Sequence, residues 1–101
     1  MFVVIFRAQL NTDANQLDKA YYATAARLRK LAIDKYGCIE FSSISEGDEE
    51  VSLSYWNSEE DINTWKADDE HRAAQEKGRN KWYRSYQIEI TKVERSYSEN
   101  Q

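Results

Sequence analysis

The order of strand-like and helix-like patterns is the strongest constraint on how this chain of 101 residues folds. Residues 2–9 (FVVIFRAQ) are rich in β-branched and aromatic side chains, which predicts a strand. Its first five residues are all apolar, so both faces of this strand are expected to be covered. Apolar residues then recur every three or four positions through residues 13–36, which predicts a long helix capped within residues 11–13 and ended by Gly37.

The second half of the chain predicts two more strands, a broken helix and a last strand. Residues 38–46 and 50–57 have strand-like composition and flank a hairpin turn at residues 47–49. Ser58 opens a capping box, and the helix that it starts begins again at residues 68–69. Residues 82–97 predict a long final strand, with a bulge where the alternation slips near Val93.

Together these elements give the order β-α-β-β-α-β, which predicts a ferredoxin-like α+β fold with an antiparallel sheet in a single domain, residues 1–101. In such a fold the helices cover one face of the sheet. The other face would carry Val3, Ile5 and their neighbours, and an exposed apolar patch of that size is unusual on a monomer. We therefore expect a homodimer in which two sheets pack face to face.

Composition narrows the function classes. The 14 Lys and Arg residues are outnumbered by 18 Asp and Glu, so no basic surplus favours nucleic acid. No apolar run is long enough for a membrane span or a signal peptide, and the only cysteine, Cys38, excludes an internal disulfide. A cytoplasmic protein is expected. Nucleotide and zinc motifs are lacking, so neither a cofactor nor a metal is expected.

Aromatic residues make up 13% of the chain, with three Trp and seven Tyr. Such side chains suit a lined cavity or a subunit interface, or a small core that uses rings for bulk. The C-terminal half spaces several of them in the pattern W-x(5)-H-x(3)-Q-x(2)-G-[RK]-x(2)-W-Y. The residues that carry this pattern are Trp65, His71, Gln75, Gly78, Arg79, Trp82 and Tyr83.

With this pattern the whole chain resembles the antibiotic biosynthesis monooxygenase (ABM) family of dimeric α+β barrels, and in particular a little-characterised bacterial branch. The resemblance implies one of two chemistries. Haem-degrading members carry an Asn on the first strand and a haem-ligating His ten residues after a Trp, but here Gln75 stands ten residues after Trp65. The first strand reads Ile5-Phe6-Arg7, without Asn, so haem degradation is disfavoured.

The second kind of relative oxidises polycyclic phenols to quinones with dioxygen and no cofactor. The resemblance implies a Trp, an aromatic hydroxyl six residues later, an Asn four residues earlier and an Arg on the last strand. This chain has Trp65, His71, Asp61 and Arg84 at those places. The Trp and the Arg are kept, whereas the aromatic hydroxyl and the Asn are replaced by His71 and Asp61. The substrate of those relatives is therefore not inferred for this chain.

The expected catalytic residues follow from these positions. His71 is the only His, and it is a candidate base because its ordinary pKa lies near neutrality; the helix dipole would lower that pKa and acidic neighbours would raise it. Trp65 would position the substrate, and Asp61 would orient His71 or a substrate hydroxyl, or simply favour a helix start. Arg7 or Arg84 would hold a developing oxyanion, although Arg7 could instead pair with Glu40 or lie at the rim.

The expected substrate-binding residues are mostly aromatic, and each could equally be part of the core. They are Trp56, Tyr86, Tyr22, Leu28 and Trp82. The first hypothesis is a cofactor-independent monooxygenase that acts on a small aromatic or polyketide-like compound. The alternatives are a non-catalytic dimeric module that binds a small hydrophobic ligand, and a scaffold whose pocket is filled by its own side chains.

Overall fold

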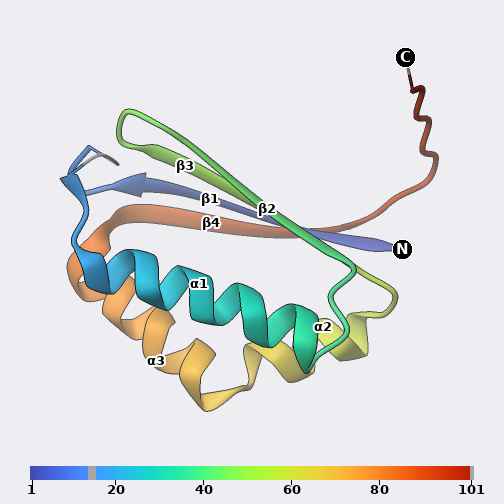
Figure 1. The fold of residues 1–101 in the computed structure, drawn as a ribbon, viewed down its shortest axis with the longest axis horizontal. Coiled ribbons are helices and arrows are strands. Elements are labelled where there is room, and N and C mark those ends of the chain that lie inside the picture. Colours follow the sequence, from blue (N-terminus) through green and yellow to red (C-terminus); the bar gives the residue numbers. More distant parts are fainter. Residues whose placement is uncertain (14–15, 101) are drawn as a thin grey trace.

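A four-stranded antiparallel sheet with all helices on one face makes up the computed structural model, which describes residues 1–13 and 16–100 (Figure 1). The strand order is β2-β3-β1-β4, so the N-terminal strand lies in the middle. The strands are β1 (Phe2–Leu10), β2 (Glu40–Glu46), β3 (Glu49–Trp56) and β4 (Tyr83–Lys92). The helical elements are α1 (Lys19–Asp34), α2 (Glu59–Lys66), α3 (Asp69–Lys77) and a π-helical turn, η2 (Gly78–Trp82). The predicted ferredoxin-like α+β fold is confirmed.

The first helix starts later than the sequence predicts. Its N-cap is Asp18, whose carboxylate accepts a hydrogen bond from the backbone N–H of Tyr21 at 2.9 Å, so the prediction of a cap within residues 11–13 was wrong. Residues 14–15 of the predicted helix lie outside the described residues. The helix ends at Asp34 with Lys35 as its C-cap, earlier than the predicted end at Tyr36. Gly37, just beyond it, adopts φ 81°, a left-handed conformation that favours glycine.

The last strand is shorter than predicted, and its bulge lies at the opposite end. β4 begins at Tyr83 and ends at Lys92, and the backbone N–H of Val93 makes a last hydrogen bond to the carbonyl of Met1 at 3.0 Å. Residues 93–97 pair with no strand, so the alternation there is not part of β4. The register instead shifts where Gln9 and Leu10 pair with Ser85 and Tyr83.

The core lies between the sheet and the helices. Trp56 of β3 and Ile62 of α2 are completely buried, and Trp65 of α2 packs against Trp56 with ring centroids 5.2 Å apart. The indole N–H of Trp56 donates to the hydroxyl of Ser54 at 2.8 Å, so its polar atom is satisfied inside the core. This cluster fixes α2 against β3.

The other face of the sheet carries no helix (Figure 1). It displays Val3 and Ile5 of β1 beside Leu53 and Tyr55 of β3, as the paired registers show. The two faces of β1 are therefore both apolar in its first half, as the unbroken apolar run indicates, but within one chain the helices cover only one of them. In the described part of the chain, no helix is long and apolar enough to cross a membrane.

Gly78 offers a test of how tightly the π-helical turn packs on β4. A Cβ at this position would lie 2.5 Å from Cε2 and 2.8 Å from Cδ2 of Tyr83. We expect Gly78→Ala to displace the Tyr83 ring and to lower the free energy of unfolding by about 1–3 kcal/mol, measured by urea denaturation.

A second background separates this steric clash from other effects. In Tyr83→Leu the ring that the Cβ would strike is removed, so Gly78→Ala should then cost little or even stabilise, because Ala is the better helix former. An equal loss in both backgrounds would contradict the clash as the cause.

Candidate active site

A cavity of about 140 Å³ lies between the sheet and the helices α1 and α3. Its walls are mainly aliphatic and aromatic and include Val4, Phe6, Leu28 and Ile88. A cavity of roughly 150 Å³ accommodates a benzene ring, so this one is large enough for a small aromatic molecule. Two groups of polar side chains also line it, one around His71 and one around Glu50.

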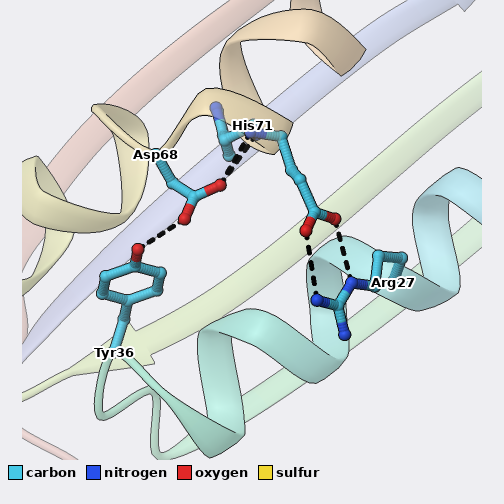
Figure 2. A network of polar contacts seen from close by, with 5 residues as sticks. Arg27, Tyr36, Asp68 and His71 are labelled. Carbon is cyan, nitrogen blue, oxygen red and sulfur yellow. Dashed lines mark hydrogen bonds and ion pairs between the residues drawn. The ribbon is translucent and has the colours of Figure 1, made fainter.

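The start of α3 is held in place by a network of polar contacts (Figure 2). One carboxylate oxygen of Asp68 accepts hydrogen bonds from the backbone N–H groups of Glu70 and His71, at 2.8 and 3.4 Å. The other oxygen accepts from the hydroxyl of Tyr36, which follows α1. Arg27 of α1 donates to both carboxylate oxygens of Glu70, at 2.9 and 3.1 Å. These contacts tie α3 to α1 and so set the position of His71.

The side chain of His71 packs edge-on against Trp65, with ring centroids 4.4 Å apart. Among the described residues, neither Nδ1 of His71 nor Nε1 of Trp65 has a hydrogen-bond partner, and both atoms are buried. Burial lowers the pKa of His71, the positive charge of Lys66 lowers it further, and Asp68 opposes the shift. His71 is therefore neutral at pH 7 and able to accept a proton. The dominant cause, burial, was not part of the sequence-based reasoning.

The second polar group centres on a buried carboxyl that sequence reasoning missed. Glu50 of β3 is only 7% exposed, and Oε1 accepts a hydrogen bond from the hydroxyl of Tyr21. Burial raises the pKa of Glu50, although the bond from Tyr21 opposes the shift. The pKa of Tyr83 is also raised, by burial and by the negative charge of Glu50. The three side chains therefore form a buried, acidic corner of the cavity.

A sequence signal for Glu50 existed in the alternation of β3. Glu50 has the same parity as Ser52, Ser54 and Trp56, so it lies on the face that carries Trp56. The two intervening serines make that face look polar. Only the helices that cover it turn Glu50 into a buried residue.

Five of the residues expected at the site line the cavity. They are His71, Trp65, Leu28, Trp82 and Tyr86. They come from α1, α2, α3, η2 and β4, so the fold brings together side chains that are far apart in the sequence. Gln75, which stands ten residues after Trp65, also lines the cavity, and an amide is a poor axial ligand for haem iron.

The other five residues lie elsewhere. Trp56 is completely buried in the core, and Tyr22 is 51% exposed on α1. Asp61 belongs to the first turn of α2, where its side chain lies beside Gly37. Arg7 points to the open face of the sheet and forms an ion pair with Glu89 at 3.6 Å, in place of the expected partner Glu40. Arg84 is exposed in the irregular stretch at the start of β4.

The raised pKa of Glu50 predicts a pH dependence of stability. The folded state holds the proton of Glu50 more tightly than the unfolded state does. The contribution of Glu50 to stability is therefore fully present below the ordinary Glu pKa of 4.5 and is lost as pH rises through the folded pKa. We expect Glu50→Gln to weaken this fall, because Gln does not ionise. Urea denaturation between pH 4 and pH 8 measures the difference. Parallel curves for the two proteins would contradict the buried, proton-holding carboxyl.

Comparison with known proteins assigns the family. A family model described as antibiotic biosynthesis monooxygenase matches residues 1–77, a range that includes Trp65 and His71. The chain is 42% identical over 95 residues to YqjZ of Bacillus subtilis (strain 168), described as uncharacterized, covering 93% of this chain and 80% of that protein. It is 32% identical over 104 residues to the jasmonate monooxygenase ABM of Pyricularia oryzae (strain 70-15), covering 100% of this chain but only 47% of that protein.

Solved structures share the fold at low sequence identity. SnoaB, a cofactor-independent oxygenase from Streptomyces nogalater, superposes with a TM-score of 0.78 at 10% identity over 97% of each chain. A putative antibiotic biosynthesis monooxygenase from Nitrosomonas europaea gives a TM-score of 0.76 at 14% identity, over 94% of this chain and 100% of that one. At such identities the likeness concerns the fold alone. From the family model and the sequence relatives, the chain belongs to the antibiotic biosynthesis monooxygenase family.

Proposed function

We propose that the chain is a cofactor-independent monooxygenase that oxidises a small aromatic or polyketide-like compound with dioxygen in the cavity. The observation that carries the proposal is a half-buried, neutral His71 that packs on Trp65 within a largely apolar cavity. Such a group can act as a general base next to a planar substrate. Membership of the family supports the reaction class, and the residues of the cavity supply the roles.

The proposed reaction needs a base and a dry, apolar site. His71 takes a proton from an acidified CH₂ or phenol of the substrate, which leaves an electron-rich anion. This anion adds dioxygen to give a hydroperoxide, and the loss of one water leaves a carbonyl group. The overall change is CH₂ + O₂ → C=O + H₂O, with all electrons supplied by the substrate. The N–H of Trp65 has no partner among the described residues and is assigned to the oxyanion, because neither Arg7 nor Arg84 lines the cavity.

Two relatives support this class of reaction without specifying the substrate. SnoaB is described as a cofactor-independent oxygenase, and the relative from Pyricularia oryzae as a jasmonate monooxygenase. The chain spans about half the length of the latter protein and has only 10% identity with the former. We therefore leave the substrate at the level of a small, largely apolar molecule.

We further propose that two chains pair through the open faces of their sheets. Ile5, Leu53 and Tyr55 are half-buried and lie in register on adjacent strands, whereas Val3 beside them is already buried within the single chain. The exposed Val51 and Ile44 extend this apolar surface along β3 and β2. Burying such a surface stabilises association, and a two-fold dimer is the usual solution. Native mass spectrometry should give twice the mass of the chain, and any additional bound mass would identify a ligand. A monomer at micromolar concentration would contradict the dimer.

Replacement of the base tests the enzymatic function directly. We expect His71→Ala to lower kcat at least about 100-fold, measured as oxygen uptake during a screen of monocyclic and polycyclic phenols. In the wild type, kcat/KM should fall as pH drops below the ordinary His pKa of 6.5, because only neutral His71 accepts the proton.

Arg72→Ala is the matched control, since Arg72 is the exposed neighbour of His71 on α3 and should keep full activity. Unchanged turnover in His71→Ala would refute the base. A ligand that binds without any oxygen uptake would instead identify a non-catalytic binding protein.

A further inference from the structure

The acidic corner around Glu50 has no role in the proposed reaction, yet it lines the same cavity as His71. Glu50 and Ser54 both face the cavity and are separated by four residues of strand, which corresponds to roughly 13 Å. Trp65 and His71 lie toward the end of the cavity near Trp56, with which Trp65 packs. The cavity therefore has two polar ends, and apolar side chains together with the serines of the sheet line the space between them.

Among the described residues, none of those that face Glu50 carries a positive charge. Tyr21 of α1 and Tyr83 of β4 face it, its neighbours across β3 are Ala8 of β1 and Ser45 of β2, and Trp82 of η2 packs on Tyr21. Burial and the bond from Tyr21 are the only influences that shift its pKa. A buried carboxyl without a cation is costly unless further hydrogen bonds compensate it.

The hydrogen bonding of Glu50 leaves room for one more donor. Tyr21 donates to Oε1, and among the described residues no other side chain donates to this carboxyl. A carboxylate accepts several hydrogen bonds through its two oxygens. A donor on a bound molecule would therefore supply the compensation that the protein itself lacks.

The end of the cavity near Trp65 and His71 favours a hydrogen-bond acceptor on the ligand, rather than a donor. The buried N–H of Trp65 is a donor, and Lys66 also lines the cavity and acts on His71 as a positive charge. An oxygen that accepts hydrogen bonds or develops negative charge suits that end, whereas a carboxylate at the Glu50 end would meet a like charge.

We propose that Glu50, held by Tyr21, contacts the substrate and accepts a hydrogen bond from a neutral donor group. The substrate class is then a small ring that carries a hydroxyl or amino group at one end and the reacting, oxygen-bearing group at the other. This inference rests on the proposed use of the cavity as the substrate site. It adds a specificity-determining residue that acts independently of the base.

A pair of ring compounds of nearly equal shape tests the contact. 4-Hydroxybenzyl alcohol has a hydroxyl donor at each end, and 4-ethylphenol replaces one hydroxyl by a methyl group. The binding of each compound to the full chain is measured by isothermal titration calorimetry and by tryptophan fluorescence. For each protein variant we take the ratio of its affinities for the two compounds. Because the two compounds differ in hydrophobicity by the same amount in every variant, a change in this ratio between variants reports the contact with the protein.

We expect the ratio to shift toward 4-ethylphenol by about 10-fold in Glu50→Met, because the hydrogen bond to the carboxyl is lost. Glu50→Gln keeps an acceptor and the contact with Tyr21, so a smaller shift, of about fivefold, is expected there. Glu49→Met is the matched control, since Glu49 is exposed on the opposite face of the same strand and should leave the ratio unchanged.

An unchanged ratio in both Glu50 variants would overturn the proposal, as would the failure of either compound to bind the wild type at millimolar concentration. If Glu50→Met does not fold, Glu50→Gln alone decides. The measurement needs no turnover, so a Glu50-dependent ratio without oxygen uptake would refute the monooxygenase and leave the Glu50 contact standing.

Discussion

The packing of Trp65 on the completely buried Trp56 is the contact on which the rest of the site depends. It anchors α2 to the end of β3 and, through the short connection at residues 67–68, fixes where α3 begins. Asp68 then caps α3, and Arg27 ties it to α1 through Glu70 (Figure 2). These contacts hold His71 edge-on against the same indole. Trp65 thus belongs to both the core and the cavity wall, so its packing in the core also fixes the position of His71.

The cavity combines two groups whose pKa values burial shifts in opposite directions. The pKa of His71 is lowered and that of Glu50 is raised, because burial disfavours whichever form is charged. Each group therefore costs some stability at pH values where it would otherwise ionise. Buried groups with shifted pKa values that converge on one cavity are typical of functional sites, since a structural core would be more stable with apolar residues.

Much of the architecture could be predicted from the sequence, and the misses have identifiable causes. The order of elements, the hairpin at Gly47 and the buried stripe of α1 followed from local periodicity and turn chemistry. The start of α1 was misplaced because several residues before Lys19 are good caps. Asp18 differs from Asn11, Thr12 and Asp13 in capping Tyr21 while it also forms an ion pair with Lys81, a tertiary contact that the sequence does not reveal. The last strand was overextended because alternation continues past Lys92, although no neighbouring strand is left to pair with it.

The same distinction applies to the candidate site, where some residues could be identified from the sequence and others only from the tertiary structure. The resemblance to the family, together with the fact that His71 is the only histidine, was enough to single out Trp65 and His71. The short connection between α2 and α3 then keeps these two residues close in the structure. The sequence could not tell that Arg7 faces away from the cavity or that Glu50 faces into it, because that depends on which face of the sheet the helices cover. Local patterns thus determined the elements and which residues of each strand share a face. Only the tertiary structure decided which of the two faces is buried, and with it the charge and the pKa values of the groups in the cavity.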